Sequence, residues 1–131
     1  MKNILVLGAL PKDEERIGIY KSIASVCKEH ADNISTPIET AGFKGTEKER
    51  YERAFQKVRE ADLIIGELSE PSTGQGMEIM EAANLNKPVV ILALEGSKVS
   101  GLVRGCPAVK KILFYNDKGD LKKKLEKHLT S

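Results

Sequence analysis

The chain has 131 residues, of which 40% are hydrophobic and 31% are charged, an ordinary balance for a globular protein. Lys and Arg number 21 against 19 Asp and Glu, giving a net charge of +2, which is too small to indicate a nucleic-acid-binding or membrane-surface protein. This length predicts one domain over residues 1–131, large enough to bury its own core.

Cysteine usage and hydropathy exclude several further classes of protein. Cys27 and Cys106 lie far apart and match no metal-ligand spacing, so we predict no metal site and no cofactor. The apolar run near the N-terminus is too short for a signal peptide, and no run approaches the ~18 residues of a membrane span. We therefore expect a cytoplasmic protein.

Five short apolar runs alternate along the chain with segments of helical periodicity. Continuous apolar runs bounded by Gly or Pro are typical of parallel strands buried on both faces, and apolar residues spaced three and four apart predict the helices. The expected strands cover Ile4–Leu7, Ile34–Ile38, Leu63–Gly66, Val89–Leu94 and Ile112–Tyr115. The expected helices cover Asp13–His30, Thr46–Ala61, Gly76–Asn86, Val99–Arg104 and Asp117–Leu129, with a loop over residues 39–45.

This alternation predicts an α/β fold, a Rossmann-like three-layer sandwich with a five-stranded, mainly parallel sheet. In such sheets ligands bind in the crevice beyond the carboxyl ends of the strands. The candidate site then lies among the polar, mostly glycine-containing loops at residues 8–12, 38–45, 67–76 and 95–104.

The clearest anion-binding pattern is Ser72-Thr-Gly74-Gln-Gly76, at the start of a predicted helix. Glycines let the backbone approach an anion, and the first N–H groups of a helix lack partners within the helix. The spacing is neither a dinucleotide fingerprint nor a P-loop, so a monophosphate fits better than a dinucleotide or triphosphate. The alternative is that Ser72 or Thr73 only caps the helix and the glycines only allow the turn.

Glu78 is the leading candidate for chemistry, because it follows that turn and lies near the crevice. The positive end of the helix dipole favours its ionised form, and an ionised carboxylate beside a sugar is what nucleophilic glycosidic chemistry requires. The alternative is a glutamate that merely complements the helix dipole. Glu67, at the end of the third expected strand, is a weaker candidate for an acid or hydrogen-bond acceptor.

Other polar residues are weaker still. Asp62 lies at the wrong end of its strand and reads as a cap or turn residue, and His30 and His128 lie at helix ends, where a dipole interaction explains them. Ser100 and Arg104 lie in a late polar loop that is able to meet an anion.

One long run resembles a known family. The segment ADLIIGELSEPSTGQGME, from Ala61 to Glu78, is followed by Lys87-Pro88 and Arg104-Gly105. It resembles the 2'-deoxynucleoside 5'-monophosphate N-glycosidases of the nucleoside 2-deoxyribosyltransferase superfamily, with Pro-Ser-x-Gly-x-Gly-x-Glu as the most specific part. The close match covers about a third of the chain.

The resemblance implies a flavodoxin-like domain, usually a homodimer, that cleaves the bond between base and deoxyribose of a small nucleotide or nucleoside. Glu78 then takes the position of the nucleophile that forms a glycosyl-enzyme intermediate. Ser72 takes that of a phosphate-binding serine, helped by N–H groups near Gly74 and Gly76, with Gly8 beside them. Ser100 matches a serine lent to the phosphate by the neighbouring subunit.

The sequence also departs from the family pattern. An aspartate that handles the proton on the leaving base would fall at Ala54, and a tyrosine that holds the nucleophile would fall at Leu5. The family's Gly-Ser-Ile-Arg reads Gly8-Ala-Leu-Pro11 here, without the phosphate-binding serine and arginine. Acid–base assistance is typically worth ~10²–10⁴-fold, which the loss of the aspartate puts at risk unless Glu52 or Glu67 substitutes.

Three hypotheses follow. The first is an N-glycosidase or deoxyribosyltransferase with Glu78 as nucleophile. The second is a nucleotide- or phosphosugar-binding module without catalysis, which Ala54, Leu5 and Ala9 favour. The third is the same fold with an unrelated partner.

Overall fold

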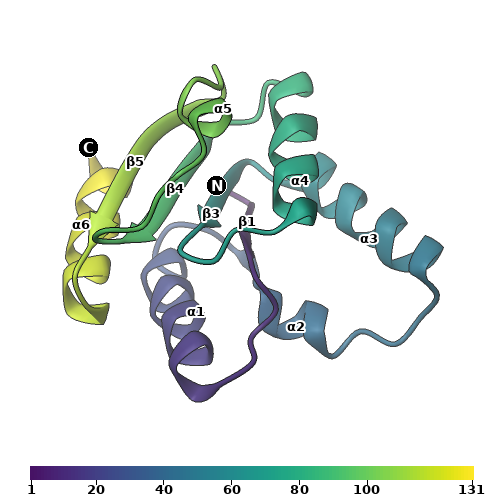
Figure 1. Cartoon of the computed structure of the whole chain (residues 1–131), viewed down its shortest axis with the longest axis horizontal. Coiled ribbons are helices and arrows are strands. Elements are labelled where there is room, and N and C mark those ends of the chain that lie inside the picture. The colour runs from purple at the N-terminus through teal and green to yellow at the C-terminus, as the bar shows by residue number, and fades with distance from the viewer.

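The computed structural model describes residues 1–131 as a five-stranded sheet between two layers of helices (Figure 1). The strand order is β2-β1-β3-β4-β5 and every neighbouring pair is parallel, which is the flavodoxin-like order. The strands are β1 Asn3–Gly8, β2 Asn33–Ser35, β3 Leu63–Glu67, β4 Val89–Leu94 and β5 Val109–Tyr115. The helices are α1 Glu14–Cys27, α2 Pro37–Ala41, α3 Glu47–Glu60, α4 Thr73–Asn84, α5 Gly101–Arg104 and α6 Lys118–Thr130.

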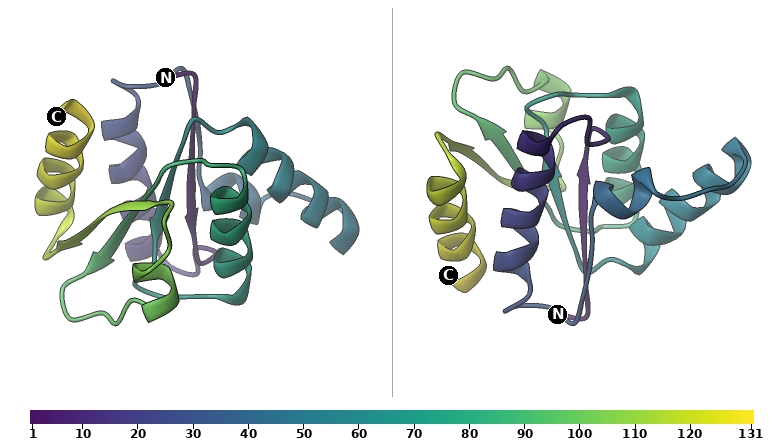
Figure 2. Two further views of the ribbon diagram at one scale, coloured as in Figure 1. Left: turned by 90° about the horizontal axis from the view of Figure 1, so that it is seen from above. Right: turned by 90° about the horizontal axis from the view of Figure 1, so that it is seen from below.

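The two faces of the sheet hold two separate apolar clusters, because successive side chains of a strand point to opposite faces. On one face Ile4 and Val6 of β1 pack with α1 and α6. On the other face Leu5 and Leu7 pack with residues of α3 and α4 such as Val58 and Ile79. Figure 2 shows α1 and α6 side by side on one side of the sheet and α3 to α5 on the other. The predicted three-layer α/β fold is therefore confirmed.

Side-chain caps fix where the long helices begin. The Asp13 carboxylate accepts a hydrogen bond from the backbone N–H of Arg16, three residues into α1. Thr46 and Glu49 form the predicted capping box at the start of α3, with both reciprocal hydrogen bonds present. These bonds satisfy N–H groups that have no partner within the helix.

The structure corrects several of the expected elements, since α1 ends at Cys27 rather than His30 and β5 begins at Val109 rather than Ile112. Residues 34–38 do not form one strand: β2 ends at Ser35, and the short helix α2 begins at Pro37, inside the expected strand, and ends at Ala41, inside the expected loop. Thr36 caps this helix and Pro37 occupies its first turn, where proline needs no N–H partner. Helix α4 begins at Thr73 rather than near Gly76.

The fold brings the carboxyl ends of all five strands to one edge of the sheet. Gly8 of β1 lies opposite Glu67 of β3, and this pair stands where the strand order changes direction. Ligands of this fold class bind at such a point. At the other edge Asp62 accepts hydrogen bonds from the backbone N–H groups of Lys2 and Asn3, so it has the structural role expected for it. No helix is both long enough and apolar enough to cross a membrane.

Candidate active site

A cleft of about 670 Å³ opens beyond the carboxyl end of β1, between α2, α3 and the beginning of α4. Such a volume suits a small organic ligand. The cleft brings together Gly8, Ser72, Gly74 and Glu78 from the predicted site, although these residues come from two separate segments of the chain. Gly76, Ser100 and Glu67 do not line it.

The beginning of α4 is fixed by a capping box between Ser72 and Gln75. The Ser72 hydroxyl accepts from the Gln75 backbone N–H at 3.4 Å, and the Ser72 N–H donates to the Gln75 side chain at 2.9 Å. The Gln75 side chain, which is buried, also donates to the backbone carbonyl of Glu67. Ser72 therefore does cap the helix, and it also stands on the wall of the cleft.

The glycines near the cleft differ in whether packing within the chain requires the absence of a side chain. A Cβ added to Gly8 would meet the Tyr20 hydroxyl at 2.2 Å, so packing against Tyr20 already requires glycine at this position. A Cβ added to Gly74 or Gly76 would meet nothing within 4 Å. Packing within the chain therefore does not account for glycine at positions 74 and 76, even though glycine weakens a helix.

Glu78 stands in the second turn of α4, half-buried, and lines the cleft. Burial raises the pKa of its carboxyl to about 7, because removing water disfavours the charged form. This corrects the expectation that the helix dipole alone keeps Glu78 ionised. Near neutral pH the protonated and ionised forms are comparably populated, as in a group suited to proton transfer or regulated nucleophilic attack.

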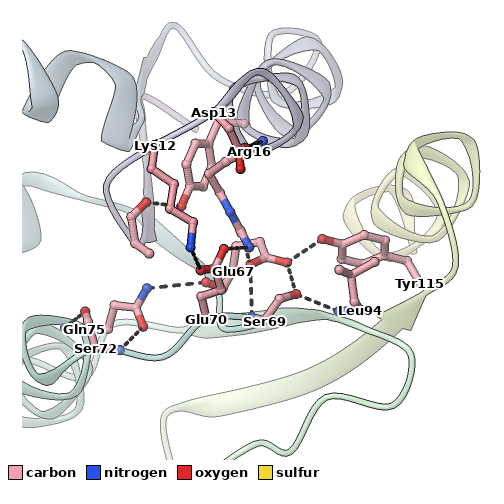
Figure 3. A network of polar contacts seen from close by, with 12 residues as sticks. Lys12, Asp13, Arg16, Glu67, Ser69, Glu70, Ser72, Gln75, Leu94 and Tyr115 are labelled. Atoms are coloured by element: carbon pink, nitrogen blue, oxygen red, sulfur yellow. Dashed lines mark hydrogen bonds and ion pairs between the residues drawn. The ribbon is translucent and has the colours of Figure 1, made fainter.

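Glu67 belongs to a buried polar network rather than to the cleft (Figure 3). Its side chain is fully buried and pairs with Arg16 at 2.6 Å. Ser69 donates to it through both its backbone N–H and its hydroxyl, and the Tyr115 hydroxyl donates as well. With its oxygens occupied in this way, Glu67 serves as an anchor for the strand ends.

The same network extends to the surrounding loops. Arg16 also pairs with Glu70 at 2.7 Å, and Glu70 pairs with Lys12 at 2.8 Å. Burial acts to lower the pKa of Arg16, but the hydrogen bonds to Glu67 and Glu70 and the charge of Glu67 raise it overall. The Ser69 hydroxyl accepts from the backbone N–H of Leu94. The network thus joins the β1–α1 loop, the β3–α4 loop and the end of β4.

A second, apolar hollow of about 390 Å³ lies on the far side of the α4 N-terminus, against α5. Ser72 and Gly76 line it together with Ser100, which caps α5. Within one chain, therefore, Ser100 lies near the α4 turn but outside the main cleft. Leu102 and Met80 at the border of this hollow are 90% and 58% exposed, leaving an apolar surface open.

Three cations of α3 also line the main cleft, and sequence reasoning missed them. Arg50, Arg53 and Lys57 recur at helical spacing. Two aromatic residues of the same helix, Tyr51 and Phe55, contact each other with ring centroids 4.5 Å apart. The available signal was the spacing of the basic residues, which places them on one helical face.

The positions at which the chain departs from the family pattern also line the cleft. Leu5, Ala9, Leu10 and Ala54 give it an apolar lining. Glu52, considered above as a substitute acid, does not line it. No group of three or more His, Cys, Asp or Glu side chains is placed to hold a metal ion, and burial raises the pKa of the Cys27 thiol to about 12, which keeps it protonated.

Comparisons with solved structures agree with this architecture. The CMP N-glycosidase of Clostridium botulinum superimposes with a TM-score of 0.76 over 97% of this chain and 99% of that chain, at 18% identity. A 2-deoxyribosyltransferase from Bacillus psychrosaccharolyticus gives 0.69 over 92% and 90%, at 16% identity. At these identities the similarity establishes the fold. No protein-family model matches the chain.

Sequence relatives define the family. A protein of Syntrophotalea carbinolica, provisionally named 2'-deoxynucleoside 5'-phosphate N-hydrolase 1, is 32% identical over 75% of this chain and 69% of its own. A Methanosarcina mazei protein with the same name is 29% identical over 92% and 80%. The 5-hydroxymethyl-dUMP N-hydrolase of Danio rerio is 25% identical over 81% and 80%. With its nucleotide-hydrolase relatives, its fold and its Pro-Ser-x-Gly-x-Gly-x-Glu segment, the chain belongs to the 2'-deoxynucleoside 5'-phosphate N-hydrolase family.

Proposed function

We propose that this chain is an N-glycosidase that cleaves the base–sugar bond of (2'-deoxy)nucleoside 5'-monophosphates. The observation that carries the proposal is the placement of Glu78 in one cleft with Ser72 and Gly74, at the N-terminal end of the same helix. The free N–H groups of this helix end favour a phosphate. A phosphate bound there leaves the sugar beside the carboxylate one turn further along the helix.

In the proposed reaction, the ionised carboxylate of Glu78 attacks the anomeric carbon as the base departs. The glycosyl ester is then opened by water, which restores the carboxylate. The buried network around Glu67 holds the strand ends that position α4, so we assign Glu67 a structural contribution to catalysis rather than contact with the substrate.

We further propose that residues 1–131 act as one cytoplasmic domain within a homodimer, with Ser100 of one subunit reaching the phosphate in the other. The support for the dimer is the apolar hollow beside Ser72, together with the exposure of Leu102 and Met80 around it. Exposed apolar surface of this kind often marks an interaction site.

Incubation with single (deoxy)nucleoside monophosphates, followed by chromatography for free base, tests the activity. Release of base by the wild-type chain but not by Glu78→Gln supports the proposal. No base from any nucleotide at high enzyme concentration and long times contradicts it.

A second candidate is a nucleotide-binding module without turnover, and the apolar Leu5 and Ala54 positions in the cleft favour it. In that case nucleotide still raises the melting temperature while no base is released. A ligand at 100 times its Kd stabilises the folded state by ~2.7 kcal/mol, so thermal shift detects such binding. Transfer of the sugar to an added free base, in place of water, identifies a deoxyribosyltransferase instead.

A further inference from the structure

The α3 wall of the cleft carries a row of positive charges, which we call the cation row: Arg50, Arg53 and Lys57. Their positions, three and four residues apart, fall on one face of the helix, and all three line the cleft. Ala54 lies among them on the same face and lines the cleft as well. The row is thus a feature of the cleft itself and not of the outer surface alone.

No carboxylate of the chain neutralises this row. The six ion pairs of the molecule involve other cations. Arg53 donates to the Thr40 hydroxyl at 3.3 Å and stacks on Phe43, with 5.2 Å between its guanidinium carbon and the ring centroid. Lys57 is half-buried, and its ammonium group makes no hydrogen bond or ion pair within the chain. These N–H donors therefore have no carboxylate partner within the chain and are free to meet a ligand in the cleft.

Arg50 has a different role within the row. It reaches the backbone carbonyls of Thr40 and Phe43, each at 3.5 Å, and so holds the segment between α2 and α3. Arg53 and Lys57 are left as the residues with spare donors. An arginine has five N–H groups and a lysine three, and neither side chain accepts a hydrogen bond.

The α4 wall, which faces the cation row across the cleft, determines which part of a bound nucleotide contacts the row. This inference rests on the proposed function, in which the phosphate lies at Ser72 and the sugar at Glu78, both on α4. Because α3 and α4 are neighbours on the same face of the sheet, a nucleotide held in this way directs its base toward α3. The departing base thus meets Arg53 and Lys57.

Breaking a glycosidic bond requires that the leaving group be protonated or that its developing charge be stabilised. Apart from Glu78, the only carboxylate lining the cleft is Glu47, which is exposed in the first turn of α3. It precedes Ala54 by seven residues, or roughly 10 Å along the helix axis. No acid therefore accompanies Ala54 on this part of the wall, whereas two cations do.

We propose that Arg53 and Lys57 stabilise the departing base as an anion, in place of a general acid. The Glu78 carboxylate forms a bond to the anomeric carbon, the carbon–nitrogen bond breaks, and its electron pair stays on the base. The guanidinium and ammonium groups donate hydrogen bonds to the carbonyl oxygens over which this charge spreads. Water then opens the glycosyl ester; its hydroxyl goes to the sugar and its proton balances the base anion.

This mechanism selects bases by chemistry. A pyrimidine-2,4-dione leaves through N1, and the negative charge left on N1 spreads onto the O2 and O4 carbonyl oxygens, which both accept hydrogen bonds. An exocyclic amino group in place of the O4 oxygen would set its own N–H donors against the N–H donors of the cation row. We expect dione nucleotides to be cleaved faster than amino-substituted ones.

The test is the dependence of kcat/KM on the acidity of the leaving base. The substrates are dUMP and its 5-fluoro and 5-methyl derivatives, because fluorine makes the departing nitrogen more acidic and methyl makes it less so. We expect kcat/KM to rise steeply with acidity. Arg53→Gln and Lys57→Gln should each lower it by ~10²-fold, a typical cost of removing one transition-state donor, with the largest loss on the 5-methyl substrate.

Two controls accompany the variants. Arg59→Gln removes the same charge from the same helix at a position that does not line the cleft and should leave kcat/KM unchanged. Arg53→Lys should restore part of the activity lost in Arg53→Gln. Thermal unfolding of each variant verifies that it is folded.

The outcomes separate this inference from the proposed function. Base release that is insensitive to leaving-group acidity, or unchanged in both variants, overturns the inference and leaves the N-glycosidase intact. A loss seen with nucleotides but absent with the matching nucleosides would mean that the row binds phosphate, which also overturns it. No base release from any substrate overturns both proposals together.

Discussion

At the scale of single residues, Glu78 links function to a cost in stability. Because burial raises the pKa of this carboxyl to about 7, the folded chain holds a proton that the unfolded chain has lost between pH 5 and pH 7. Stability from this group is thus present at low pH and is lost as the pH rises through 7.

Two measurements follow from that shift. Since only the ionised carboxylate is a nucleophile, kcat/KM should rise with pH and level off above about 7, falling roughly tenfold for each unit below it.

Glu78→Gln should abolish base release while increasing the free energy of unfolding at pH 8 by about 2 kcal/mol, with little gain at pH 5. Glu81→Gln, the same change on the same helix at a position that does not line the cleft, is the control. A flat pH profile contradicts the assignment of Glu78 as nucleophile.

The buried pair of Arg16 and Glu67 has a structural role, so breaking it should lower the free energy of unfolding, whereas removing the charge of Glu78 should raise it. Arg16→Ala leaves a fully buried carboxylate without its cation, and breaking such a pair costs about 3–5 kcal/mol. Chemical denaturation measures this loss. Lys12→Ala, which removes an exposed member of the same network, should cost far less, because solvent screens an exposed ion pair. Equal effects of the two changes would count against a structural anchor at Glu67.

At the scale of elements, the first turn of α4 should show a trade between helix stability and ligand binding. Gly74→Ala adds a Cβ in open space, and alanine is favoured over glycine in a helix by about 0.5–1 kcal/mol. The variant should therefore melt at a higher temperature when free, yet bind nucleoside monophosphates more weakly if the backbone approaches phosphate there. Isothermal titration calorimetry measures the binding. Tighter or unchanged binding contradicts the phosphate site.

Sequence patterns predicted most elements of this fold because their signals are local. The apolar run of β4 and the capping box at Thr46 each lie within a few residues and were both confirmed. The helix α2 was missed, because five residues are too few to show a helical period. The beginning of α4 was predicted three residues late, since its glycines lower helix propensity and obscure the capping box at Ser72.

The candidate site was only partly predictable, for a physical reason. Ser72 and Glu78 lie on one helix, so their proximity follows from sequence spacing. The burial of Glu67 does not, because its partners Arg16 and Tyr115 lie 51 and 48 residues away. Long-range pairing decides whether a carboxylate faces solvent, a ligand or the interior, and no local pattern records it.

At the scale of the whole molecule, the apolar hollow between α4 and α5 bears on assembly. Leu102→Asp places a charge on its most exposed apolar residue and should convert the proposed homodimer to a monomer. Sedimentation measures the mass, and nucleotide binding should weaken in parallel if Ser100 acts across the interface. Leu85→Asp, on an exposed residue outside the hollow, should leave the mass unchanged. A wild-type monomer contradicts the proposed dimer.

The α4 wall of the cleft is held more firmly by polar contacts than the wall formed by α2 and α3. The end of β3 and the loop after it are held by the ion pairs of Arg16 with Glu67 and Glu70, of which the first is buried, whereas the wall around α2 is held by arginine contacts at 3.3–3.5 Å. Mutations around α2 and in the cation row change the wall proposed to meet the base, while Glu78 and the buried network that positions its helix stay as they are. Related enzymes can thereby diversify the bases they accept by exchanging one wall, and an engineer can build libraries there with the other wall left intact.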